Sequence, residues 1–274
     1  MISLGRSCRL VGLLLPLLAG CASLPDRHLP GVAASPGEAA KVLAVLRDQD
    51  GAVRSLRAVA RVRIAIGGAI RHLREVVALR TSGVLRLETL GALGMPVHRL
   101  ILNDQMITIW NSRGGFSRAE ATREGLAKLA GIEVAPLHLI RILVGLPPEP
   151  VSDGAVVHVV PEARAYVVAT EGTDFRQRLT LGGEPLSLLH GELVTGRQRL
   201  RFRFSRPSAG GLLPEQVNLS HGEGAFEIWV TYVQAELNLE LPDHLFEIAP
   251  PGRSVLPLSH RVVGEERAAW PPWA

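Results

Sequence analysis

Apolar and polar residues alternate along much of the chain, beginning near residue 60. Val62, Ile64 and Ile66 interleave with Arg61 and Arg63, and a period of two places the apolar side chains on one face of a β-strand. Further short strand-like runs, separated by turns with Gly, Asn or Ser, lie at about residues 72–80, 84–89, 96–102, 106–111, 156–160, 165–171, 175–181, 186–192, 197–205, 214–220 and 226–233. Their close spacing predicts an antiparallel meander rather than parallel strands joined by crossover helices.

A helix is predicted before the first strand. Residues 35–38 (Ser-Pro-Gly-Glu) have the sequence of a capping box with proline at the first helical position. The helix that they open should break near residues 50–51. A second helical stretch or turn is predicted around Val53, Leu56 and Val59.

Two more helices are predicted between the two groups of strands. Thr122 is placed to cap a helix that stops at Gly131, and Pro136 opens another that runs to Val144. Gly145 then supplies the left-handed residue with which many helices end. Apolar side chains surround most of the last helix, so we expect it to be buried. The whole pattern predicts an α+β protein with an antiparallel sheet.

The N-terminus has the organisation of a bacterial lipoprotein signal. Arg6 and Arg9 precede a short apolar run at residues 10–18, which is too short for a permanent membrane span. The run ends in Leu-Ala-Gly-Cys, typical of a lipobox, so we predict a signal peptide at residues 1–20 and lipidation of Cys21. The alternative is an ordinary secretory signal with Cys21 near the cut by chance.

Cleavage before Cys21 also removes Cys8, so no disulfide can form within the mature chain. Ala22 stands at the position where, in the best-known sorting rule, aspartate retains a lipoprotein at the inner membrane. We therefore expect an anchor through Cys21 on the periplasmic face of the outer membrane.

Three segments are expected after the signal peptide. Residues 21–34 contain two prolines and no apolar period, which predicts a flexible tether. Residues 35–250 should form one folded domain. The tail at residues 251–274 contains Trp270 and Trp273 among prolines; it is either disordered or lies against the membrane interface through these rings.

The charge pattern does not favour a nucleic-acid partner. The formal net charge is +4, and loss of Arg6 and Arg9 with the signal peptide lowers it to +2. Arginines alternate with other residues at 197–203. This row is either a solvated sheet face or a stripe that binds anionic lipid head groups.

Catalytic and metal-binding motifs are missing from the sequence. The nine histidines are scattered, and there is no His-Glu-x-x-His, no Gly-x-Ser-x-Gly and no phosphate-binding Gly-x-x-x-x-Gly-Lys-Ser/Thr. We therefore expect no catalytic residues, no metal and no cofactor, and thus a protein that is not an enzyme.

An ordered series of elements runs from Val84 to Pro148, and a related one lies near the C-terminus. The series consists of a strand ending at residues 87–89 (Leu-Glu-Thr), an apolar turn at 93–94, a strand at 96–102, a hairpin near 103–105, a helix at 122–131, the segment APLHLIRILVGLP at 135–147 and the segment LPDHLFEI at 241–248. It resembles the LolA/LolB superfamily, and its outer-membrane receptors, the LolB proteins, in particular. Compared with those receptors, the chain is longer and poorer in aromatic residues.

The resemblance implies a strongly curved antiparallel half-barrel that does not close, with helices plugging its concave face. It also implies that acyl chains of lipoproteins bind in an apolar cavity and are inserted into the outer membrane. The expected partners are those acyl chains, the inner leaflet of the outer membrane and a LolA-like periplasmic carrier, and the protein is expected to be a monomer. Two alternatives stay open: a binding protein for a glycolipid or phospholipid, and a structural subunit of an envelope assembly without a ligand.

Two sets of residues are candidates for this function. The turn with Leu90, Leu93 and Met95 is apolar where turns are usually polar. Leu93 matches the protruding leucine of the LolB receptors. The turn either enters the membrane or folds back on a helix. The helix after Pro136 is either plain core or the wall of an acyl cavity, through Leu137, Leu139, Ile140, Leu143 and Val144.

Overall fold

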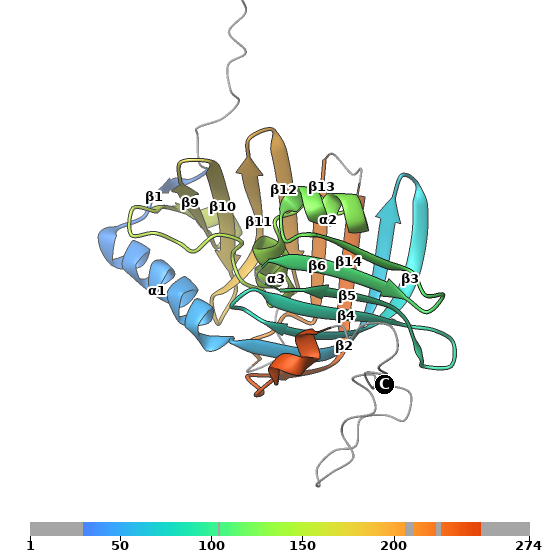
Figure 1. The fold of residues 1–274 in the computed structure, drawn as a ribbon. Helices are drawn as coiled ribbons and strands as arrows, with labels where there is room; N and C mark the ends of the chain where they lie inside the picture. The colour runs from blue at the N-terminus through green and yellow to red at the C-terminus, as the bar shows by residue number, and fades with distance from the viewer. Residues whose placement is uncertain (1–29, 104, 206–210, 223–225, 248–274) are drawn as a thin grey trace, which may run out of the picture.

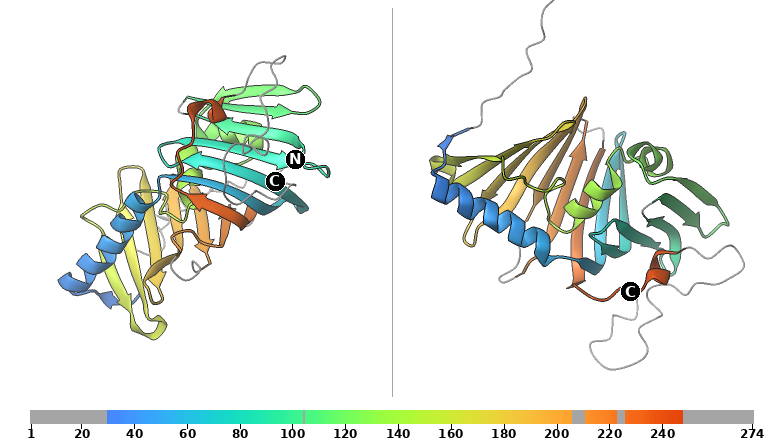
Figure 2. Two further views of the ribbon diagram at one scale, coloured as in Figure 1. Left: turned by 90° about the horizontal axis from the view of Figure 1, so that it is seen from below. Right: turned by 60° about the vertical axis from the view of Figure 1, so that its left-hand side comes forward.

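The computed structural model describes residues 30–103, 105–205, 211–222 and 226–247 of the chain. These residues form one antiparallel sheet of 14 strands, in the order β1-β8-β9-β10-β11-β12-β13-β14-β2-β3-β4-β5-β6-β7, with β1 and β7 at its two ends. The sheet is therefore not closed. Its strong curvature is visible in Figure 1 and in the two views of Figure 2.

Two meanders build this sheet. The first comprises β2 (Ser55–Ile66), β3 (Ala69–Arg80), β4 (Val84–Leu90), β5 (Pro96–Leu102), β6 (Met106–Asn111) and β7 (Phe116–Glu120). The second comprises β8 (Val156–Val160), β9 (Ala165–Glu171), β10 (Phe175–Gly182), β11 (Ser187–Thr195), β12 (Gln198–Phe204), β13 (Gln216–His221) and β14 (Phe226–Leu237). The last strand, β14, pairs with the first long strand, β2, and this long-range pairing joins the two halves.

Three α-helices accompany the sheet: α1 (Pro36–Ala52), α2 (Arg123–Ala130) and α3 (Pro136–Leu143). The predicted capping box of α1 is present, because Ser35 and Glu38 exchange hydrogen bonds between side chains and backbone. Thr122 caps α2 by accepting a hydrogen bond from the Gly125 amide at 3.0 Å. Two short 3₁₀ turns, η1 (Pro161–Ala163) and η2 (Asp243–Phe246), and the strand β1 (Val32–Ala33) complete the described elements.

The two faces of the sheet differ in what covers them. We call concave the face on which α1 and α3 lie (Figure 2), where side chains of both helices join the main apolar core. The other face, which we call convex, carries a small apolar cluster where residues 241–246 cross β3, β4 and β5. Beneath that segment, Glu88 is fully buried and accepts hydrogen bonds from Arg86 at 2.5 Å and Arg99 at 2.6 Å.

The predicted fold class is confirmed: the protein is α+β with a curved, unclosed antiparallel sheet. The predicted helix or turn around Val53, Leu56 and Val59 is wrong, because Leu56 and Val59 lie in β2. Ala58, Val59 and Ala60 are all fully buried there, and the pairing with β14 shifts register opposite Val59 and Ala60. With both faces covered, the period of two that marks an ordinary strand is lost.

Two short edge strands escaped the sequence pattern. β7 is a mostly polar, exposed strand, and β1 lies within the segment predicted as a tether. Residues 21–29 of that tether, together with the signal peptide and the tail at 251–274, lie outside the described residues. Within the described parts of the chain, no helix is long and apolar enough to cross a membrane.

Candidate functional site

Helix α3 lies at the centre of the concave face (Figure 1). It begins at Pro136, whose fixed φ suits the first helical turn. Leu139, Ile140, Leu143 and Val144, four of the five residues predicted to line a cavity, are buried in the main core. The fifth, Leu137, is 47% exposed. The sequence thus identified a buried apolar helix, and its role in holding acyl chains stays a prediction.

The C-terminal end of α3 is held firmly. The Tyr232 hydroxyl donates a hydrogen bond to the Leu143 carbonyl at 2.5 Å, and burial raises the pKa of that hydroxyl, which keeps it a neutral donor. Arg141 donates to the Pro147 carbonyl at 2.7 Å and to the Asp50 carboxylate, at the end of α1, at 2.5 Å. These bonds fix the end of the helix to the sheet and to α1.

The N-terminal end of α3 is attached more loosely. Ala135 precedes the helix without a side-chain capping bond. One turn further on, His138 Nε2 lies 2.6 Å from Glu149 Oε1. The segment that leads into α3, residues 131–135, connects it to α2. The start of α3 is thus held by fewer hydrogen bonds than its end.

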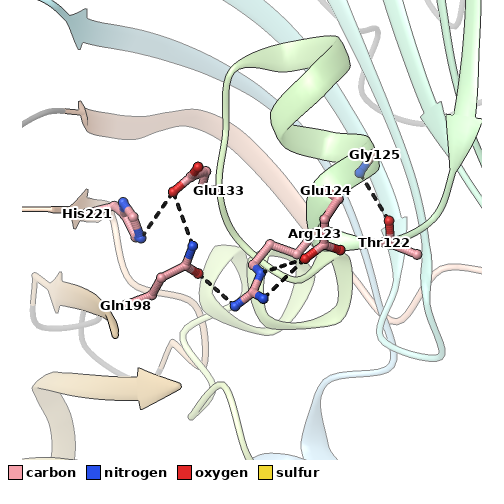
Figure 3. Close-up of polar contacts among 7 residues, drawn as sticks. All are labelled: Thr122, Arg123, Glu124, Gly125, Glu133, Gln198 and His221. Atoms are coloured by element: carbon pink, nitrogen blue, oxygen red, sulfur yellow. Dashed lines mark hydrogen bonds and ion pairs between the residues drawn. The ribbon is translucent and has the colours of Figure 1, made fainter. Parts of the chain in front are cut away.

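Four polar residues hold this connecting segment to the opposite strands, and we call them the clasp: Arg123, Glu133, Gln198 and His221 (Figure 3). Arg123 donates to Gln198 Oε1 at 2.8 Å, and Gln198 Nε2 donates to Glu133 Oε2 at 3.2 Å. His221 Nε2 lies 4.0 Å from the same Glu133 oxygen. Because the clasp is partly solvent-exposed, each of these bonds contributes little to stability.

Among the described residues, two small cavities border α3. A cavity of about 160 Å³ lies beside the clasp and is lined in part by Val134, Leu193 and Leu200. A second cavity, beside Val144, has room for about 20 Å³. Pockets for small organic ligands start at roughly 300 Å³. A fatty acyl chain would therefore have to displace α3 to enter this part of the concave face.

A further part of the concave face is apolar and incompletely covered. Ile64, Leu73, Leu87, Leu100 and Ile109 are all partly exposed. The strand register places Leu87, Leu100 and Ile109 side by side on β4, β5 and β6. We did not predict these residues as lining, although the alternating pattern that predicted their strands also assigns them to one face. We call them the concave apolar strip.

One acidic residue lies beside this strip. Glu75 on β3 is 6% exposed and accepts a hydrogen bond from Thr89 at 2.7 Å. Burial raises its pKa to about 7, with a smaller contribution in the same direction from the negative charge of Glu88. Near neutral pH, a large fraction of Glu75 side chains is therefore protonated and uncharged, as an apolar surface requires.

The predicted apolar turn has one buried and two exposed members. Leu90 packs into the small convex cluster, whereas Leu93 is 92% exposed and Met95 is 55% exposed. Backbone bonds from Gly91 to Met95 at 2.9 Å and from Gly94 to Gly91 at 3.0 Å close the turn. Leu93 is therefore not packed against a helix, and its contact with a membrane stays a prediction.

The other predicted site residue, Cys21, lies outside the described residues. Among the residues that the structure does describe, no group of three or more His, Cys, Asp or Glu side chains could hold a metal ion. The apolar concave face, the clasp and the exposed turn are therefore the features from which we derive a function.

Comparison with known proteins finds similar folds among solved structures. No family model and no curated protein matches the chain. A LolA superfamily protein from Nitrosomonas europaea shares 13% identity over 76% of this chain and 97% of its own, with a TM-score of 0.52. A protein domain from Vibrio parahaemolyticus, described as outer membrane lipoprotein-sorting, shares 11% identity with the same coverages and TM-score. A DUF1329 family protein from Desulfovibrio piger shares 14% identity over 78% of this chain and 98% of its own, with a TM-score of 0.48. The first two likenesses show that the chain has the fold of these LolA-type proteins.

Proposed function

We propose that this protein is a lipoprotein of the bacterial envelope that binds acyl chains on its concave face, as a LolB-like receptor does. The observation that carries the proposal is the concave apolar strip, a partly exposed apolar surface that packs against the core to which α3 belongs. Hydrocarbon tails need apolar area and shape but no hydrogen-bond partners. The strip offers that area without disturbing the core under α1.

Extension of an acyl chain from the strip into the part of the concave face that α3 fills requires that α3 gives up part of its own contacts. A chain of about 15 methylenes gains on the order of 10 kcal/mol when it leaves water, at roughly 0.8 kcal/mol for each methylene. Displacing the start of α3 costs the burial of one or two apolar side chains, each worth about 1.5–3 kcal/mol. The balance favours binding, and the polar clasp adds only a small barrier.

Delivery to a membrane is assigned to the turn with Leu90, Leu93 and Met95. Leu93 and Met95 project from the protein, and Leu90 anchors the turn in the convex cluster. We place the protein on the periplasmic face of the outer membrane, anchored through Cys21, with a LolA-like carrier as donor. The acyl chain then passes from the carrier to this protein and on to the membrane, each of which binds it more tightly than the one before, so no nucleotide is needed.

The proposal is tested by photo-cross-linking. A photoreactive amino acid at Leu100, in the concave apolar strip, should capture a tri-acylated lipopeptide, whereas the same group at Arg201 on the convex face should not. Equal capture at the two positions, or none at Leu100 in a folded protein, would overturn the proposal.

The turn is tested separately with Leu93→Glu. Because Leu93 is exposed, the change should leave the melting temperature within about 2 °C. It should slow delivery of the lipopeptide to vesicles roughly tenfold, since burying a charge in hydrocarbon costs at least a few kcal/mol. Leu239→Glu, at another exposed leucine, is the control. Unchanged delivery would remove the turn from the mechanism.

A second candidate function has one observation in its favour. The space beside α3 is largely filled by the protein's own side chains, as in a structural subunit of an envelope assembly that binds no ligand. Absence of lipid capture would favour this candidate. Native mass spectrometry of the captured species would distinguish a lipopeptide from a glycolipid or phospholipid.

A further inference from the structure

A wide groove lies on the convex face, opposite the concave apolar strip. It has a volume of about 670 Å³ and is formed by β2, β3, β14 and the turn that follows β4. Arg61 and Arg63 on β2 line it because they alternate with the core residues of that strand. The groove therefore follows from the same period of two that builds the core, yet nothing in the proposed acyl site uses it.

The register gathers positive charge in this groove. Arg61 lies directly opposite Arg74 on β3, and Arg63 lies opposite His72 on β3 and Trp229 on β14. None of the described residues that line the groove is an aspartate or glutamate. Like charges directly opposite each other in a sheet are destabilising, so their presence indicates a groove suited to an anion.

Two acidic residues on the convex face have bonding partners of their own. Glu88, on the same face, bonds to Arg86 and Arg99. Glu227 accepts a hydrogen bond from Asn218 at 3.0 Å. Desolvation and the charge of Arg61 both lower the pKa of Arg74, as expected from the direct opposition of these two side chains on β2 and β3.

An aromatic ring and the apolar turn border the charged groove. The Arg63 guanidinium lies 3.9 Å from the centre of the Trp229 ring. Leu90, Gly91 and Ala92 form part of the groove wall, and the exposed Leu93 follows them directly. Tryptophan rings and arginines are typical of the head-group level of a bilayer, with apolar side chains below them.

We propose that this groove binds the phosphate group of an anionic phospholipid at the bilayer surface while Leu93 enters the hydrocarbon. The inference rests on the membrane contact of the turn in the proposed function and adds the lipid class that it recognises. Arg61 and Arg63 pair with the phosphate, and Trp229 lies at the interface beside it.

The test measures binding of the mature chain, residues 21–274 with Cys21→Ser, to vesicles. One set contains phosphatidylcholine alone, and the other contains phosphatidylcholine with phosphatidylglycerol. Arg61→Gln with Arg63→Gln should weaken binding to the anionic vesicles about ten- to thirtyfold, as expected for two arginines close to a charged surface. Raising the salt concentration should reduce the difference.

The matched control is Arg199→Gln with Arg201→Gln, which removes the same charge from the convex face outside the groove. It should weaken binding less than threefold. Equal losses in both double variants, or no loss in the groove variant, would overturn the inference. So would tight binding of inorganic phosphate without any preference for the anionic vesicles.

The two proposals fail in different ways. Lipopeptide capture at Leu100 should be unchanged in the Arg61→Gln, Arg63→Gln variant, since these side chains lie on the other face of the sheet. Absence of capture in a chain that carries only the photoreactive group at Leu100 would contradict the proposal that acyl chains bind the concave face. Intact capture with unchanged vesicle binding in the groove variant would contradict the groove alone.

Discussion

At the scale of single residues, Glu75 makes the stability of the protein depend on pH. Its pKa is raised to about 7 by burial. Below the unfolded value near 4.5, both states hold the proton and there is no penalty. As the pH rises from about 4.5 to about 7, the unfolded state loses the proton of Glu75 while the folded state keeps it. The free energy of unfolding therefore falls over this range. The full loss is about 3 kcal/mol, at roughly 1.4 kcal/mol for each pKa unit.

The Glu75→Gln variant should remove this dependence. Urea unfolding at pH 5 and pH 8 is expected to show a loss for the parent chain and a much smaller one for the variant. Glu240→Gln, at an exposed position, should behave like the parent. A parent chain that is as stable at pH 8 as at pH 5 would contradict the burial of Glu75 as an acid.

Two glycines that end helices make a second test at this scale. Gly145, after α3, and Gly131, after α2, both have positive φ, at 82° and 72°. A Cβ at Gly145 would lie 2.7 Å from Cδ of Pro214, whereas one at Gly131 meets open space. Alanine at Gly131 should cost about 1–2 kcal/mol from backbone strain alone. The Gly145→Ala variant should lose at least about 1 kcal/mol more free energy of unfolding than the Gly131→Ala variant. Equal losses in thermal or urea unfolding would show that this end of α3 is not tightly packed.

At the scale of elements, the clasp controls how readily the segment before α3 opens. Glu133→Ala removes the acceptor for Gln198 and the neighbour of His221. Amides of residues 131–135 should then exchange with solvent about two- to fivefold faster, the effect expected of one partly exposed hydrogen bond. The Glu171→Ala change, at an exposed residue outside the clasp, is the control. Identical exchange in the Glu133→Ala variant and the parent would show that the clasp does not hold the segment.

The sequence predicted elements well where one face was buried and the other wet. The alternation in β3, β5 and β12 marked their strands to within a few residues. It failed at Leu56 and Val59, where both faces are buried, and at β7, which is mostly polar and exposed. The site was predicted only in part. Local patterns identified α3 and the turn, but the concave apolar strip depends on pairing between distant strands, and the clasp joins residues 123 and 133 to residues 198 and 221.

At the scale of the whole molecule, the two faces of one curved sheet differ in polarity. The concave face holds the apolar core, the apolar strip and α3, while the convex face carries the arginine-lined groove. The exposed turn is continuous with the wall of that groove. The two proposals above therefore assign the acyl chain and the membrane to opposite faces of the same strands.

The central claim is that α3 yields the concave face to an acyl chain, and hydrogen exchange of α3 with and without a tri-acylated lipopeptide tests it most directly. The account predicts that the amides of residues 137–140 exchange faster when the lipopeptide is bound, while those of β2 and β14 do not change. Saturating lipopeptide that leaves the exchange of α3 unaltered, or slows it, would contradict the account.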